Sequence, residues 1–300
     1  MFGICACIGT GGMVQAKAIT DNISGTFGLP TWLCGLILVG LCVAVLLGGV
    51  RRIGAVAGKI VPFMAIMYVF MCLLIIGMNI EKVPSVFWWV ISDAFQPTAA
   101  TGGFVGATVM MAIRQGMARG IFSNEAGLGT APMAHAAAST EDPVEQGMWG
   151  VFEVFIDTII ICTITALAVI LSGVLNAEGG LDAFTSKGAA AVAAFNTILP
   201  GTLGGTVIQI SLLFFALSTI LGWSYYGEQC WSYLFKGNKA VLVLFKIVFI
   251  AVCVVGATGN GTLVWDISDT LNGMMAIPNL VALLALSGVT AAETKRYFKK

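Results

Sequence analysis

Residues 121–130 read Ile-Phe-Ser-Asn-Glu-Ala-Gly-Leu-Gly-Thr, a polar and glycine-rich stretch inside an otherwise apolar sequence. Arg114 and Arg119 precede it, and Pro132 and the single histidine of the chain, His135, follow it. In a membrane, backbone that leaves a helix must be buried in protein or line a cavity, because lipid offers no hydrogen-bonding partners. The stretch therefore predicts a helix that is broken at a binding site.

The composition explains why lipid is the expected surrounding. The chain has 300 residues, of which 58% are hydrophobic and 10% charged, and its mean hydropathy is +0.95. In soluble domains roughly a quarter of all residues are charged, so this chain lacks the polar groups to cover a water-facing surface. The formal net charge is zero, which offers no basic face for nucleic acid. These features predict an all-α polytopic membrane protein in a lipid bilayer, with no nucleic-acid partner.

Apolar segments along the chain predict about eight transmembrane helices, since a spanning helix needs about 20 apolar residues. They cover approximately residues 2–24, 31–50, 60–80, 103–138, 144–173, 202–235, 240–257 and 262–289. Residues 84–97, with Trp88 and Trp89, predict an interfacial helix on the outer side. An outer loop over 174–201 is predicted to hold a short helix at 188–198. Together the segments predict one transmembrane domain over 1–300, with the broken helix at about 103–138.

Basic residues predict the orientation in the membrane. Arg51, Arg52 and Lys59 form a cluster between the second and third spans, and the C-terminal tail is also basic. Cytoplasmic loops carry an excess of lysine and arginine, so both regions are predicted to be cytoplasmic. The first residues after Met1 are apolar and show no leader with a basic start. We therefore expect the chain to begin inside a membrane helix, as a fragment or from a misplaced start.

The polar groups inside the fourth span are the strongest candidates for a site. Asn124 and Glu125 coincide with Gly127 and Gly129. Breaking a helix frees N–H groups at the start of the following half-helix, where the partial positive charge suits a carboxylate. Half-helix ends of this kind recognise anionic substrate groups in transporters. The alternative is a kinked helix whose glycines only permit close packing.

Other polar positions are open to two interpretations. Ser218 and Thr219 are adjacent hydroxyls that can bond back to their own helix or ligate a hard cation such as sodium. The acids and the base inside apolar segments are functional candidates, or lie near enough to an interface to reach water; they are Glu153, Asp157, Glu228 and Lys246. In the last span, residues 266–279 predict a further interruption, with a kink at Pro278.

Enzymatic functions are not predicted. The sequence has no G-x-S-x-G, H-E-x-x-H, P-loop or dinucleotide-binding fingerprint. None of the eight cysteines forms a C-x-x-C pair, and a metal or disulfide framework needs clustered spacings. We expect no catalytic residues, no cofactor and no resident metal.

Four runs closely resemble signature sequences of the sodium:alanine/glycine symporter family, and the similarity covers essentially the whole chain. They are ATVMMAIRQGMARGIFSNEAGLGTAPMAHAAA at 107–138, FIDTIIICTITA at 155–166, LSTILGWSYYGE at 217–228 and DTLNGMMAIPN at 269–279. The resemblance implies the leucine-transporter fold of the amino acid–polyamine–cation superfamily, a 5+5 inverted repeat with broken first and sixth core helices. Matched to that scheme, the chain corresponds to core helices 3–10 and residues 121–130 to the break in the sixth. The N-terminal helices of the scheme, with a Gly-Thr-Gly-Asn type motif in the first, have no counterpart in the sequence.

The resemblance also implies a set of binding residues. Asn124, with its neighbours Phe122, Ser123 and Gly127, would bind the substrate amino acid. Gln15 resembles a glutamine that reaches the same ligand, although Gly12 and Lys17 beside it depart from the family pattern. Trp223 would close the pocket. Ser218 and Thr219 fall where the eighth core helix contributes to a sodium site.

The resulting hypothesis is symport of sodium with a small neutral amino acid, alanine or glycine, by alternating access across the cytoplasmic membrane. Sodium is then a co-transported ion and not a cofactor. One alternative is a proton-coupled transporter or one for another solute, with Glu125 as the proton carrier. A second alternative is a non-transporting scaffold or a truncated remnant.

Overall fold

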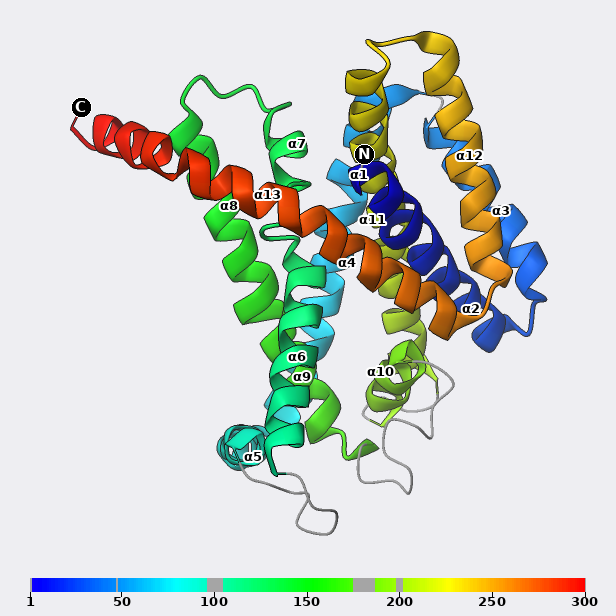
Figure 1. Ribbon diagram of the computed structural model, residues 1–300. Coiled ribbons are helices and arrows are strands. Elements are labelled where there is room, and N and C mark those ends of the chain that lie inside the picture. The colour runs from blue at the N-terminus through cyan, green and yellow to red at the C-terminus, as the bar shows by residue number, and fades with distance from the viewer. Residues whose placement is uncertain (1, 47, 96–104, 175–186, 198–201, 300) are drawn as a thin grey trace. The chain divides into compact units, whose positions relative to one another are not determined.

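The computed structural model describes residues 2–46, 48–95, 105–174, 187–197 and 202–299, and the regular structure in these ranges is helical (Figure 1). The prediction of an all-helical fold is confirmed for these ranges. The chain forms two compact units. Unit 1 contains Met1–Ala65, Ala126–Phe152 and Gln209–Lys300, and unit 2 contains Ile66–Glu125 and Glu153–Ile208.

Six helical segments in the described part of the chain are long and apolar enough to cross a membrane. They are Phe2–Gly25, Gly49–Met78, Pro143–Leu171, Leu203–Leu234, Lys239–Thr258 and Gly261–Tyr297. Two of the eight predicted spans do not qualify. Helix α3 (Thr31–Leu46) has 16 residues, fewer than the roughly 20 that a span needs. Helix α6 (Val105–Asn124) is less apolar, because it includes Arg114 and Arg119.

The N-terminal part of unit 1 is one helical segment with a wide turn in its middle. Helix α1 (Phe2–Ala6) continues into the π-helix η1 (Cys7–Val14) and then into α2 (Gln15–Phe27). Helix α12 (Lys239–Thr258) packs against α3, η1 and α2, while α13 (Gly261–Tyr297) packs against η1 and α1. In Figure 1 the dark-blue α1 and the orange-to-red α13 accordingly lie side by side.

Glycines allow the helices of unit 1 to approach closely. A Cβ atom at Gly11 would lie 2.2 Å from the Trp223 side chain on α11 (Leu203–Leu234). At Gly256 a Cβ would lie 2.4 Å from Met13. Small residues at helix interfaces let backbones approach in membranes, where apolar surface alone gives little driving force. The core behind these contacts contains Trp223, Phe245 and Phe249, each at most 2% exposed.

Unit 2 holds the C-terminal part of α4 (Gly49–Met78), η2 (Ile80–Lys82), α5 (Val83–Phe95), α6, the π-helix η3 (Phe155–Ile161), α9 (Cys162–Leu171) and α10 (Lys187–Asn196). Helix α9 packs against α5, η3 and α10, and α6 packs against η3. A helix is present at each predicted position, α5 at 84–97 and α10 at 188–198, while the interfacial location of α5 stays a prediction. Pro97 and most of the predicted loop 174–201 lie outside the described residues.

The start of α4 corrects a sequence prediction. Arg51, Arg52 and Lys59 were expected in a loop before a span beginning at residue 60, but α4 begins at Gly49 and includes all three. Arginine and lysine are good helix formers, and their exposed side chains can reach water from a helix. The basic cluster therefore marks the edge of an apolar region and not the end of a helix.

The two predicted interruptions have different outcomes. Helix α6 ends at Asn124, and the next helices are α7 (Ala131–His135) and α8 (Pro143–Val154), so the chain leaves the helical conformation within residues 121–130. The predicted interruption of the last span is wrong, because α13 runs without a gap through Pro278 to Tyr297. The basic tail, expected beyond the last span, is for the most part the end of the same helix.

Candidate functional site

The break between α6 and α7 is built from left-handed backbone. Glu125 has a φ of 53°, Gly127 of 81° and Gly129 of 89°. A right-handed helix cannot contain such residues, and glycine adopts this conformation without the steric cost that a side chain brings. The last α6 bond is donated by the Glu125 N–H to the Ile121 carbonyl oxygen at 3.0 Å. From Glu125 to Gly129, every second residue therefore has a positive φ.

The half-helix that follows the break is shorter than the sequence predicts. Helix α7 spans only the five residues Ala131–His135. A helix dipole sums over aligned peptide units, so one so short adds little charge at its start. The backbone amides of the break itself, and not a helix terminus, are the groups that could meet an anion.

On the unit 1 side, the side chains of Leu128 and Asn279 hold the break, and Thr130 is buried beside it. Leu128 is 2% exposed and belongs to the same apolar core as Trp223. The Asn279 amide nitrogen Nδ2 donates to the Gly127 carbonyl oxygen at 3.0 Å. Thr130 is 1% exposed, and its Oγ1 has no hydrogen-bond partner among the described residues. Gly127 is thus held by the last helix, and Thr130 offers a buried hydroxyl beside it.

On the unit 2 side, the end of α6 is bonded to the π-helix η3. The Ser123 hydroxyl donates to Asp157 Oδ2 at 2.7 Å, and Asn124 Nδ2 donates to Thr158 Oγ1 at 3.0 Å. The sequence singled out Asp157 as an acid in a span, but Thr158 gave no signal of its own. π-Helical turns often occur at functional sites, because the wider turn reorients side chains.

Phe122 has a cationic neighbour in the same unit. The Arg119 guanidinium carbon lies 5.7 Å from the centre of the Phe122 ring. This distance is within the range of a cation–π contact. The contact stabilises the positive charge of Arg119 near the end of α6. The sequence analysis treated Arg119 only as a residue that flanks the polar stretch.

Gln15 lies directly after the π-helix η1, and its side chain is bonded to that helix. Gln15 Nε2 donates to the Thr10 carbonyl oxygen at 3.5 Å, at the long limit of a hydrogen bond. The Thr10 side chain meets α13, with its Oγ1 2.7 Å from Ser268 Oγ and donating to Asn272 Oδ1 at 2.8 Å. Sequence reasoning noted Asn272 but missed Thr10 and Ser268, because no local pattern relates residues so far apart.

Trp223 lies in the core of unit 1 and not at an exposed rim. It is 2% exposed, and its ring packs edge-on against Tyr226 with centroids 5.7 Å apart. The Cys7 thiol donates to the Trp223 carbonyl oxygen at 3.0 Å. The indole Nε1 has no hydrogen-bond partner among the residues that the structure describes. Its predicted part in closing a pocket stays a prediction.

Ser218 and Thr219 are both bonded back to their own helix. Each hydroxyl donates to the Phe215 carbonyl oxygen at 2.9 Å. This is the structural interpretation that the sequence left open. A hydroxyl that donates still has lone pairs on its oxygen, so the arrangement keeps both oxygens available to a cation.

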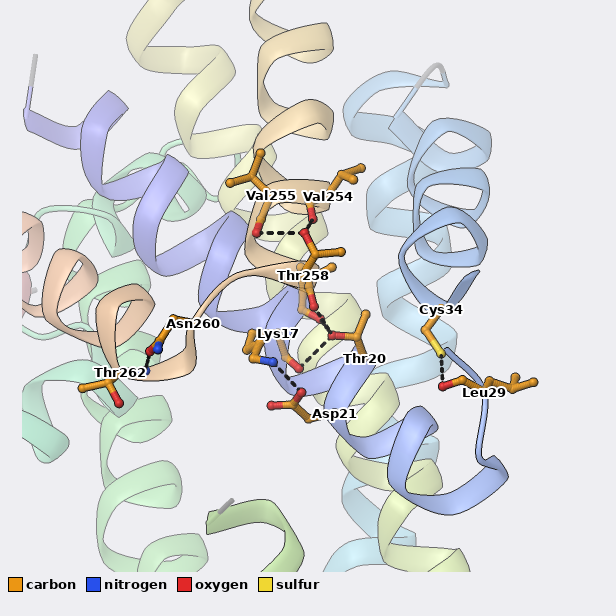
Figure 2. A network of polar contacts seen from close by, with 12 residues as sticks. Lys17, Thr20, Asp21, Leu29, Cys34, Val254, Val255, Thr258, Asn260 and Thr262 are labelled. Carbon is orange, nitrogen blue, oxygen red and sulfur yellow. Dashed lines mark hydrogen bonds and ion pairs between the residues drawn. The ribbon is translucent and has the colours of Figure 1, made fainter. Parts of the chain in front are cut away.

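Two pairs of oppositely charged side chains lie in unit 1. Figure 2 shows the Lys17 ammonium directed at the Asp21 carboxylate, 2.7 Å away and one turn along α2. Lys246 on α12 pairs with Glu228 on α11 at 3.2 Å. Burying an unpaired charge costs far more than burying a pair. Lys17 is therefore accommodated by a local acid.

The predicted binding residues fall into both units. Phe122, Ser123 and Asn124 belong to unit 2. The remaining predicted residues, Gln15, Gly127, Ser218, Thr219 and Trp223, belong to unit 1. Each group is described within its own unit, so a single site made of all of them stays a prediction.

Comparison with known proteins places these features in context. The model of the sodium:alanine symporter family matches residues 1–300. The sodium/alanine symporter AgcS of Methanococcus maripaludis is 45% identical over 296 residues, which is 99% of this chain and 63% of AgcS. An uncharacterized transporter of Haemophilus influenzae is 45% identical over 301 residues, 100% of this chain and 64% of that protein. A sodium/proton-dependent alanine carrier protein of Bacillus sp. PS3 is 35% identical over 284 residues, 91% of this chain and 63% of that carrier. The chain thus spans just under two thirds of the length of these relatives.

Proposed function

The chain belongs to the sodium:alanine symporter family, and on that premise we propose that it carries a small neutral amino acid, alanine or glycine, across the membrane together with sodium. The family and the relatives are transporters, which points away from an enzyme. Membrane location and amino-acid symport agree with the six apolar helices. The coupling ion, the amino acid and the residues that bind them are the proposed part.

The helix break at Glu125–Thr130 is the observation that carries this proposal. It places non-helical backbone inside a chain of apolar helices, where such backbone is tolerated only if it is buried or lines a cavity. Its amides can donate to a carboxylate, and the Asn124 side chain can bond a polar group of the same ligand. A zwitterionic amino acid with a small side chain presents those groups.

Sodium is assigned to the hydroxyls of α11. Ser218 and Thr219 present two oxygens on adjacent residues, both oriented by the Phe215 carbonyl. Hard cations prefer oxygen ligands. Coupling further requires that sodium and the amino acid each favour the same conformational state by a difference in free energy. Alternating access then moves both ligands together.

The proposed topology follows the positive charge of the chain. The end of α13 carries Lys295 and Arg296 in its last turn, and Arg51 and Arg52 lie at the start of α4. By the positive-inside rule, we place the end of α13 and the start of α4 on the cytoplasmic side of the cell membrane.

Uptake into proteoliposomes tests the proposal. The purified chain is reconstituted, and labelled L-alanine uptake is measured with an inward sodium gradient and, separately, with choline and an inward proton gradient. We expect accumulation above the external concentration only with sodium. A Ser218→Ala/Thr219→Val double variant should lose the alanine accumulation that the sodium gradient drives. Absence of sodium-driven uptake by the unsubstituted protein would refute the proposal.

Proton coupling is the second candidate, since the relative from Bacillus sp. PS3 carries both ions in its name. Glu125, held in a left-handed conformation at the break, is the acid that would take the proton. Uptake driven by the proton gradient alone, and lost in Glu125→Gln, would favour this candidate over sodium.

A further inference from the structure

Asn279 connects the last helix to the backbone of the break. It lies on α13 directly after Pro278, and its Nδ2 donates to the Gly127 carbonyl oxygen at 3.0 Å. The two residues are 152 positions apart in sequence. Among the described residues of unit 1, it is the only hydrogen bond between α13 and the segment Gly127–Gly129.

The Gly127 carbonyl is a group that needs such a partner. Its residue has a φ of 81°, which turns the backbone out of the helical path. Gly127 is half-buried, and a carbonyl shielded from water without a partner costs about as much as a lost hydrogen bond, which lipid cannot replace. The Asn279 amide therefore satisfies backbone that the break would otherwise leave without a protein donor.

The same side chain also lies directly against Gly129. A Cβ atom at Gly129 would lie 2.9 Å from Asn279 Oδ1 and 3.0 Å from its Cγ. Real Cβ contacts are essentially never this short, so Asn279 occupies the space that any other residue at this position would need. The amide thus covers both positive-φ glycines, one through a hydrogen bond and the other through packing.

Apolar contacts of the same helix reinforce this arrangement. Leu128, between the two glycines, and Met275, four residues before Asn279, both belong to the buried core of unit 1. Residues four apart share one face of a helix. One face of α13 therefore offers both a core side chain and the amide that bonds to the break.

We propose that Asn279 is a positioning residue for the amino-acid site. It fixes the direction of the peptide groups from Gly127 to Gly129, so that they are in place before the ligand binds. This role rests on the proposed function, because it assumes that the break binds the transported amino acid. Preorganised donors bind more tightly than flexible ones, since the cost of ordering them is already met in the empty protein.

The test measures hydrogen exchange and transport in the same variants. Asn279→Leu keeps a similar size without the donor, and Asn279→Ala removes the side chain. The control is Asn260→Ala, which removes the N-cap of the same helix, where Asn260 Oδ1 accepts from the Thr262 N–H at 3.0 Å. Amide exchange over residues 126–130 is followed by mass spectrometry, and L-alanine uptake gives KM and the maximal rate.

We expect exchange over 126–130 to accelerate about three- to tenfold in both Asn279 variants, the size of one net hydrogen bond. KM for alanine should rise by a similar factor, with a smaller change in maximal rate. Asn260→Ala should lower thermal stability without changing exchange in the break. Unchanged exchange in the Asn279 variants, or faster exchange with an unchanged KM, would overturn the proposal. Absence of uptake by the unsubstituted protein would count against the proposed function, whereas the exchange data decide separately whether Asn279 holds the break.

Discussion

Two polar stretches interrupt the apolar pattern of this chain, at 121–130 and 266–279, and they fold in opposite ways. In the first stretch the backbone is not helical between the end of α6 and the start of α7. The second remains helical throughout α13, even though it contains Pro278. Similar polarity in an apolar span therefore does not identify a break by itself.

The backbone explains the difference. The first stretch has three left-handed residues within five positions, and two of them are the glycines at 127 and 129. In the second stretch no residue has a positive φ, and proline has a φ that a helix accommodates, at the loss of one donor. Its polar side chains bond instead to other elements, Ser268 and Asn272 to Thr10 and Asn279 to Gly127. Through Asn279, the unbroken helix supplies a polar group that holds the break.

The largest expected contrast comes from the same substitution in the two stretches. Gly129→Ala adds a Cβ 2.9 Å from Asn279 at a φ of 89°, so we expect a loss of about 1–3 kcal/mol and of alanine uptake. Gly273→Ala on α13 meets nothing within 4 Å, and should stabilise the protein by roughly 0.5–1 kcal/mol. Thermal unfolding and uptake are measured together. Equal effects of the two variants would contradict this explanation.

A smaller effect is expected where the second stretch is anchored. Thr10→Val keeps the shape but removes the hydroxyl that meets Ser268 and Asn272, so their buried polar groups lose a partner. We expect about 1–2 kcal/mol of destabilisation, read from thermal unfolding. Thr262→Val, at an exposed position on the same helix as Ser268, should change stability little. If Thr10→Val is as stable as the control, the bonds from η1 do not hold α13.

The smallest effect is expected beside Asn124. Thr158→Val removes the oxygen that accepts from Asn124 Nδ2 at 3.0 Å. One net hydrogen bond contributes about 0.5–1.5 kcal/mol, so KM for alanine should change by a factor of about two to ten. Thr206→Val serves as the control, because the only described hydrogen bond of that hydroxyl is to the Thr202 carbonyl oxygen just before α11. A KM that moves equally in both variants would remove any special part for Thr158.

Much of the fold is predictable because apolar length is a strong signal. Helices α11 and α12 begin and end within one residue of the predicted 202–235 and 240–257. The break was also predictable, since polar residues coincide there with two glycines. Charge proved a poor guide to helix ends, as Arg51 and Arg52 show by lying inside α4. The side chains of these residues can reach water while their backbone stays helical.

The site was less predictable than the fold. The π-helices η1 and η3 change the hydrogen-bond register over eight and seven residues, too few to produce a periodic pattern. The partners of the break, Asn279 and Thr158, become apparent only when the helices are packed. Sequence reasoning identified Asn279 as part of an interruption, and the structure instead shows it inside a helix, bonded to Gly127.

Binding of L-alanine to an Asn124→Ala variant tests the central claim most directly, namely that the break at 121–130 binds the transported amino acid. Equilibrium binding of labelled alanine is measured on purified protein in sodium, with thermal unfolding confirming that the variant is folded. A hydrogen bond to a charged group contributes about 1.5–3 kcal/mol, so the account predicts a Kd that is about ten- to a hundredfold higher than in the unsubstituted protein. A folded variant that binds alanine with an unchanged Kd would contradict the account.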